Sequence, residues 1–145
     1  MNGKSENALI LVVADGKEHA DILTSLLAKQ GYQTRVGLNA RTAVQLAMKD
    51  PVPDLVVFDL KLSDNVGLEV CREIRRNLKI RNMLILTLTE RPEGRDCVPI
   101  FEAGCDDCVE APCNPQELIL RIQAVLHRGA IKEQINCCGS PVFER

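Results

Sequence analysis

LVVFD, residues 55 to 59, is a run of four apolar residues that ends in an aspartate. A continuous apolar run of this length is typical of a strand that is buried on both faces of a parallel sheet. ALILVVA at residues 8–14 has the same character and is followed by Asp15, and MLILTL at residues 83–88 is a third such run. These runs predict the interior strands of an α/β domain.

Segments with helical periodicity separate the strands. The expected helices cover about residues 17–30, 39–50, 67–78, 93–103 and 115–128, and two shorter strands are expected at residues 32–36 and 105–109. We expect Asn39 and Asn114 to cap the second and last helices. We also expect the first helix to bury Ile22 among its leucines and the third to bury Leu78.

Five strands that alternate with five helices predict a doubly wound parallel sheet with helices on both faces. In such sheets function lies at the carboxyl ends of the strands, near the switch in strand order. With the order 2-1-3-4-5, Asp15 and Asp59 converge in one crevice. Two carboxylates there suit Mg²⁺, and one of them can attack a phosphoryl group. A single aspartate at the end of a strand is more simply explained as a strand-ending or capping residue. Two aspartates at the switch point favour a functional site.

Composition restricts the class of protein. The chain has 145 residues, 46% of them hydrophobic and 26% charged, as expected for one globular domain. A net charge of -2 gives no electrostatic basis for binding nucleic acid or a membrane surface. Because no signal peptide or membrane-spanning run is present, we expect a cytoplasmic protein. Residues 1–7 are expected to be a tail, 8–128 the domain, and 129–145 a tail or linker to an output domain beyond residue 145.

Four segments carry a family resemblance. They are ILVVADGKEHADILTSLLAKQGYQT (10–34), PDLVVFDLKLSDNVGLEVCREIR (53–75), MLILTLTE (83–90) and EAGCDDCVEAPCNPQELILRIQAVL (102–126). In this order they resemble the receiver domain of two-component response regulators. The resemblance implies the flavodoxin-like receiver fold and a signalling module that is not an enzyme. Its partner would be a histidine kinase or another signalling protein.

The resemblance also implies a phosphorylation site. Asp59 is at the position that accepts a phosphoryl group from a histidine kinase. The family holds Mg²⁺ with this aspartate, with an acidic pair that falls on Ala14-Asp15, and with the backbone carbonyl of Lys61. The hydroxyl residue that binds phosphoryl oxygens falls on Thr87. Receivers also have a lysine before the proline that follows the fifth strand, and this position falls on Ala111.

Several positions depart from the family pattern. Ala14 replaces one acid of the pair, Ala111 replaces the lysine, and Cys108 replaces an aromatic switch residue. Leu88 stands where a small residue usually lets phosphate approach. A lysine ammonium at ~4 Å from a phosphoryl group contributes at most about 4 kcal/mol of electrostatic attraction at an effective dielectric near 20. The loss of the lysine therefore weakens the site. We therefore predict a degenerate receiver, or pseudo-receiver, with weak Mg²⁺ binding and with phosphorylation of Asp59 weak or absent.

Other functions remain as alternatives. The chain could be a working receiver that is phosphorylated on Asp59 by a histidine kinase. A metal or redox-sensing site at Cys105, Cys108 and Cys113 is less favoured, because residues three apart on a strand point to opposite faces. The first loop lacks the glycine- and serine-rich cradle of an FMN site, and DLK (59–61) lacks the second acid of Asp-x-Asp phosphohydrolases.

A few further expectations concern exposed groups and the backbone. We expect Cys137 and Cys138 to be the most reactive thiols, and a homodimer, if one forms, to use the fourth helix, fifth strand and fifth helix. His19, His127 and the arginines at positions 72, 75 and 76 are expected on solvated surfaces. The peptide bond between Ala111 and Pro112 is expected to be cis, as in the receivers that the chain resembles.

Overall fold

The computed structural model of the chain describes residues 8–14, 16–59, 66–89, 101–110 and 114–138. Within these residues one sheet of five parallel strands has the order β2-β1-β3-β4-β5. The strands are β1 (Leu9–Ala14), β2 (Gln33–Gly37), β3 (Leu55–Asp59), β4 (Leu84–Thr89) and β5 (Asp107–Glu110). The predicted strand order is confirmed.

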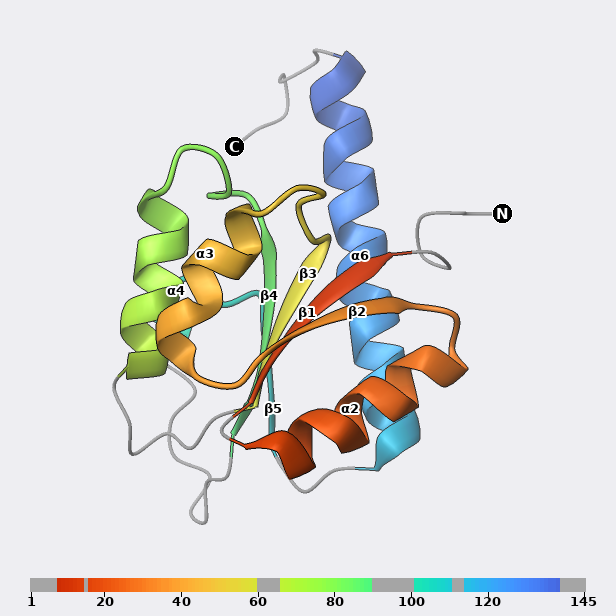
Figure 1. Cartoon of the computed structure of the whole chain (residues 1–145). Helices are drawn as coiled ribbons and strands as arrows, with labels where there is room; N and C mark the ends of the chain where they lie inside the picture. Colours follow the sequence, from red (N-terminus) through yellow and green to blue (C-terminus); the bar gives the residue numbers. More distant parts are fainter. Residues whose placement is uncertain (1–7, 15, 60–65, 90–100, 111–113, 139–145) are drawn as a thin grey trace.

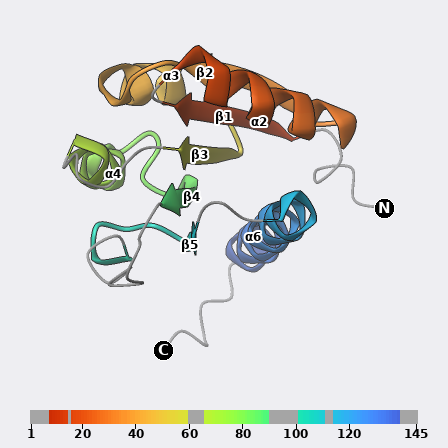
Figure 2. The ribbon, with the colours of Figure 1, turned by 90° about the horizontal axis from the view of Figure 1, so that it is seen from below.

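Helices cover both faces of the sheet (Figures 1 and 2). They are α2 (Lys17–Lys29), the short 3-10 helix η1 (Ala40–Thr42), α3 (Ala43–Met48), α4 (Val66–Arg76) and α6 (Pro115–Cys138). Figure 2 shows α3 and α4 on one side of the strands and α6 on the other, and α2 shares the side of α6. This arrangement is the doubly wound fold that alternating strands and helices predict.

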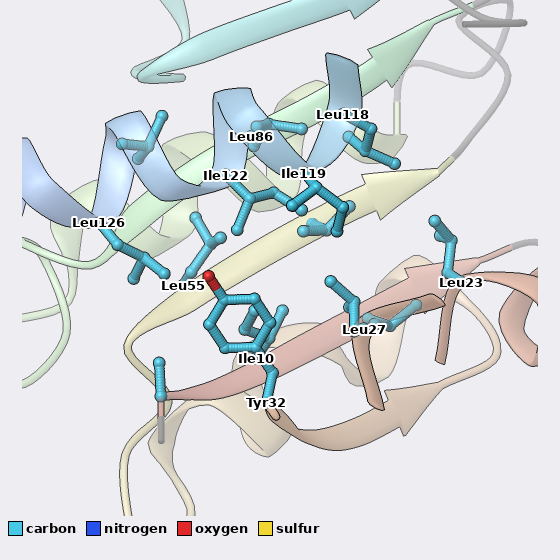
Figure 3. Close-up of a cluster of buried hydrophobic side chains, with 14 of the residues drawn as sticks. Ile10, Leu23, Leu27, Tyr32, Leu55, Leu86, Leu118, Ile119, Ile122 and Leu126 are labelled. Carbon is cyan, nitrogen blue, oxygen red and sulfur yellow. The ribbon is translucent and has the colours of Figure 1, made fainter. Parts of the chain in front are cut away.

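The central strands bury both faces, which explains why their sequences are continuously apolar. On the side of α2 and α6, Leu55 and Val57 pack with Leu27 of α2 and Ile122 of α6 (Figure 3). On the opposite side, residues such as Phe58 pack against α3 and α4. Fully burying one such side chain contributes about 1.5–3 kcal/mol, so these two clusters hold the layers together.

Two side chains that were expected in the core are exposed. Ile22 is 65% exposed, because the buried residues of α2 are Ala20, Leu23 and Leu27 and form a narrower stripe. Leu78 is 85% exposed, because α4 ends at Arg76 and Leu78 lies in the turn that follows. The helical spacing in the sequence therefore overstates the width of the buried face of α2, and it places the end of α4 beyond Arg76.

Asn114 caps α6 as expected, whereas Asn39 caps the 3-10 helix η1 and the N-cap residue of α3 itself is Thr42. The Asn39 side chain accepts a hydrogen bond from the backbone N–H of Thr42 at 3.2 Å. The Asn114 side chain accepts one from Gln116 at 2.7 Å, and Pro115 is the first residue of α6. Each asparagine thus satisfies a backbone donor that has no partner within its helix.

Helix α6 is longer than predicted. It continues to Cys138, through residues that were expected to belong to a tail or linker. A Cβ atom placed on Gly129 would lie 2.6 Å from Cδ1 of Leu84. The glycine therefore allows α6 to pack closely on the start of β4. In the described part of the chain, no helix is both long and apolar enough to cross a membrane.

Arg75 anchors α4 to the sheet and is not part of a solvated face, contrary to expectation. Its guanidinium donates hydrogen bonds to the backbone carbonyls of Gly104, Arg81 and Met83. It also pairs with the Asp106 carboxylate at 3.0 Å, and that carboxylate accepts a hydrogen bond from the backbone of β4. The planar guanidinium can serve several acceptors at once, which an ammonium cannot do in the same geometry.

Two expectations fall largely or wholly outside the described residues. Of the helix expected at about residues 93–103, the structure describes only the end, where Phe101 and Glu102 are helical. The peptide bond between Ala111 and Pro112 also lies outside the described residues.

Candidate functional site

Asp59 is the last residue of β3 and lies at the carboxyl edge of the sheet. In register, it stands between Ala14 of β1 and Leu88 of β4. Its side chain is 23% exposed, so solvent and a partner can reach the carboxylate. This position, at the switch in strand order, is where open α/β sheets bind their ligands.

Ala14 brings no ligand to this position. It is fully buried, and its side chain is a single methyl group. Asp15 and Lys61, the other groups predicted to hold Mg²⁺ with Asp59, lie outside the described residues, as does Ala111. Of the predicted metal ligands, the structure therefore places Asp59.

His19 lies beside Asp59, and the sequence interpretation missed this contact. Its Nδ1 atom is 3.6 Å from Oδ2 of Asp59, and its side chain is 55% exposed. Because β1 ends at the site, the first turn of α2, which follows β1, begins at the same edge of the sheet. That connectivity is the signal that could have identified His19 as a neighbour of Asp59.

The side chain of Thr87 lies in the core. It is buried, and its hydroxyl is 3.2 Å from Sγ of Cys105. Thr87 is in register with Phe58 and not with Asp59, so strand alternation directs it to the α4 side of the sheet. The placement gives no support to Thr87 as a phosphoryl ligand. The strand continues to Thr89, one residue beyond its expected end.

Leu88 and Cys108 also occupy packed positions. Leu88 is 5% exposed and belongs to the apolar cluster beneath α2 and α6, although its backbone is in register with Asp59. Cys108 is partly buried and packs against the cluster on the α4 side. Both side chains therefore contribute to the core.

A comparison with protein families decides the class. The model of the family described as "Response regulator receiver domain" matches residues 10–123. The chain belongs to the response regulator receiver domain family. The residues that carried the resemblance thus lie in a receiver domain with the fold they implied.

Solved structures agree with this assignment. A signal receiver domain of a signal transduction histidine kinase from Syntrophus aciditrophicus is 30% identical, with 83% of this chain and 90% of that chain covered and a TM-score of 0.72. A putative response regulator from Chloroflexus aurantiacus is 29% identical, with 83% and 98% covered and a TM-score of 0.75. NtrX from Brucella abortus is 26% identical over 91% of this chain and 29% of that longer chain, with a TM-score of 0.79.

The thiols that the structure describes, those of Cys71, Cys105 and Cys108, are packing groups. Cys105 lies before β5, and its Sγ donates a hydrogen bond to the Asp107 carbonyl. Cys105 and Cys108 both contact the apolar cluster on the α4 side, so they do not point to opposite faces of the sheet. Burial, and then the nearby Cys105, raise the pKa of Cys71 to about 12. A neutral buried thiol is a poor ligand and nucleophile. Cys113 and the side chains of Cys137 and Cys138 lie outside the described residues.

The described donor atoms do not form the all-oxygen set that Mg²⁺ prefers. The His19 imidazole, a nitrogen donor, lies beside the Asp59 carboxylate, and the side chain of Ala14 contributes no donor atom. Among the described residues, no group of three histidine, cysteine or acidic side chains is placed to hold a metal ion. Mg²⁺ takes oxygen ligands in octahedral geometry, so the described residues alone do not fit it.

Proposed function

We propose that this receiver domain acts through protein–protein contacts and that Asp59 takes up a phosphoryl group weakly or not at all. The observation that carries the proposal is the register pair of Ala14 and Asp59, in which the neighbour of the phosphoacceptor position is a buried methyl group. A phosphoryl group on Asp59 would add negative charge where a carboxylate that helps to bind Mg²⁺ is missing.

The missing lysine weakens the site further. Position 111 is an alanine, which cannot bind phosphoryl oxygens. At ~4 Å and an effective dielectric near 20, one ammonium would contribute at most about 4 kcal/mol. His19 lies near Asp59, but its side chain is more than half exposed, so solvent screens its interaction.

Roles at the site follow from these positions. Asp59 is the phosphoacceptor if the domain is phosphorylated, and Asp15 with the Lys61 carbonyl would complete a weak Mg²⁺ site. Thr89, the last residue of β4, is a better candidate than Thr87 for the hydroxyl position, because Thr87 is bonded within the core. Cys108 replaces the aromatic switch with a small, partly buried side chain.

Partners follow from the family. Receiver domains work with histidine kinases, and NtrX shows one as part of a longer chain. We propose such a partner here, an output domain beyond residue 145, and no enzymatic activity of the domain itself. If the domain dimerises, β5 and α6 would contribute to the interface together with the segment before β5. The cysteines at positions 71, 105 and 108 are in the thiol form, which is compatible with a reducing cytoplasm.

A working phosphoacceptor is the second candidate, favoured by the presence of Asp59 at the strand end. Beryllofluoride, which mimics a phosphoryl group on a carboxylate, separates the two. We expect amide NMR spectra with Mg²⁺ and beryllofluoride to show few changes, limited to residues beside Asp59. Saturable changes that extend across β4 and β5 would support the working phosphoacceptor and overturn the proposal.

A further inference from the structure

Helix α6 extends beyond the sheet that it packs on. Gly129 lies close to Leu84 at the start of β4, and the helix continues from there to Cys138. Figure 1 shows this end of α6 reaching past the strands. Short helical segments gain little stability from their own hydrogen bonds in water, and most helical stability in proteins comes from the packing of one face. A partner outside the sheet would therefore stabilise the end of α6.

The outward face of α6, on the side opposite its buried residues, has an unusual composition. It is formed by five exposed residues, Gln116, Leu120, Gln123, Ala124 and His127. None of them is Lys, Arg, Asp or Glu, and Leu120 is 64% exposed. The arginine next to this face, Arg121, pairs with Glu117 at 3.3 Å and with Asp107 of β5 at 3.4 Å. Depletion of charged residues is typical of the centre of a protein–protein interface.

The sequence continues the outward face beyond the sheet. Residues eleven apart are about three turns apart and lie on nearly the same side of an α-helix. Ile131 follows Leu120 by eleven residues. Ile135 follows Ala124 by the same interval. The outward positions therefore become more apolar in the part of α6 that has left the sheet.

The side of α6 that faces the sheet changes in the opposite sense. Ile122 and Val125 are buried on this side. The positions eleven residues later are Glu133 and Asn136, which are polar. The apolar side of α6 therefore switches near Gly129, from the side that packs on this domain to the side that faces away from it. This switch indicates a contact with a molecule outside the domain.

We propose that the outward face of α6, from Gln116 to Ile135, binds the same face of a second copy of this chain. Because the face has no Lys, Arg, Asp or Glu at these outward positions in its packed part, two copies meet there without repulsion between such charges. A two-fold pair also covers the apolar positions of both helices in one contact. The inference rests on the proposed action through protein–protein contacts, and it names the partner and the surface.

Sedimentation velocity of the full chain over a range of concentrations measures this association. A reductant is present, so that disulfide bonds between copies do not contribute. We expect a reversible dimer. Leu120→Glu should weaken the dimer at least tenfold, because it places a carboxylate in the contact. Ile131→Glu should have a similar effect, and because position 131 follows Gly129, this variant separates the proposed contact from one that is limited to β5 and the packed part of α6.

Ile22→Glu is the matched control, because Ile22 on α2 is 65% exposed and Leu120 is 64% exposed. It should dimerise like the unaltered chain. Circular dichroism checks that each variant is folded, which the exposure of Leu120 favours. The proposal is overturned if the chain remains monomeric, if the dimer survives Leu120→Glu or Ile131→Glu, or if Ile22→Glu weakens it equally. No phosphodonor is present, so these outcomes are independent of whether Asp59 can be phosphorylated.

Discussion

Ala14 and Asp59 are register partners across β1 and β3, and the side chain of Ala14 is fully buried. The last residue of β1 thus lies directly beside the proposed phosphoacceptor, but its side chain offers no oxygen atom to a metal ion. The chain has the fold of a receiver domain, and we propose that the chemistry at the edge of its sheet is reduced. This separation is possible because the fold depends on the buried strand residues and not on the polar groups at the strand ends.

Restoring the missing groups should restore phosphorylation. We expect Ala14→Asp combined with Ala111→Lys to increase the phosphorylated fraction of Asp59, because the first adds a metal ligand and the second a cation. Intact mass after treatment with acetyl phosphate and Mg²⁺ measures the fraction. Ala14→Asn with Ala111→Gln has similar size and lacks the charges, so it is the control. An equal response of both double variants would show that charge does not limit the reaction.

Arg75 should be important for stability. Arg75→Lys is expected to lower the free energy of unfolding by about 1–2 kcal/mol, because an ammonium leaves some partly buried acceptors of Gly104, Met83 and Asp106 unsatisfied. Urea denaturation measures the change. Arg72→Lys is the control, since Arg72 pairs only at 3.8 Å with the exposed Glu69 and should change stability by less than about 0.5 kcal/mol. Equal losses for the two variants would contradict the anchoring role of Arg75.

Gly104 should not tolerate a side chain. Its φ angle is +111°, and a Cβ atom would lie 2.6 Å from Cγ of Arg75. We expect Gly104→Ala to lower the free energy of unfolding by about 1–3 kcal/mol. Gly16→Ala is the control, because no atom of the described residues, its chain neighbours aside, lies within 4 Å of a Cβ there, and its φ of -165° is ordinary extended backbone. A thermal denaturation in which Gly104→Ala is as stable as the control would refute the prediction.

Cys71 should make stability depend on alkaline pH. Burial raises its pKa from 9.0 to about 12, so the folded chain keeps the thiol proton that the unfolded chain loses. The associated stability is complete below pH 9 and is lost as the pH rises toward 12, by up to about 1.4 kcal/mol per pH unit. Burial also raises the pKa of Cys105 and Tyr32, and both act in the same direction.

Urea denaturation at a series of pH values from 8 to 10.5, in the presence of a reductant, measures this slope. Cys71→Val keeps an apolar side chain of similar size and should reduce the slope without abolishing it, because Cys105 and Tyr32 remain. Identical slopes for the variant and the unaltered chain would show that Cys71 is not the group that titrates.

The sheet could be predicted because its strands bury both faces. Runs such as LVVFD at residues 55–59 must be apolar throughout, and that requirement is visible in the sequence. The helix caps at Asn39 and Asn114 were equally visible, because each depends on a single side chain that bonds its own helix. The end of α4 could not be predicted from the sequence, because Leu78 continues the helical spacing although it lies beyond the helix.

The site was predicted only in part. Asp59 follows from its place at the end of an apolar run, whereas His19 has no motif and becomes relevant only through the contact of α2 with the sheet edge. The buried contact between Thr87 and Cys105 joins segments distant in sequence, so no local pattern reveals it. The contacts of Arg75 are backbone carbonyls distant in sequence, which no local pattern reveals.

The phosphorylation state of Asp59 tests the account most directly. The full chain is incubated with acetyl phosphate and Mg²⁺ and examined by intact mass spectrometry beside Asp59→Asn, which defines modification at other residues. We expect little or no phosphoryl adduct above the level of Asp59→Asn, because Ala14 and Ala111 lack the groups that bind the metal ion and the phosphoryl oxygens. A full phosphoryl equivalent that disappears in Asp59→Asn would contradict the account and show that the domain is a working phosphoacceptor.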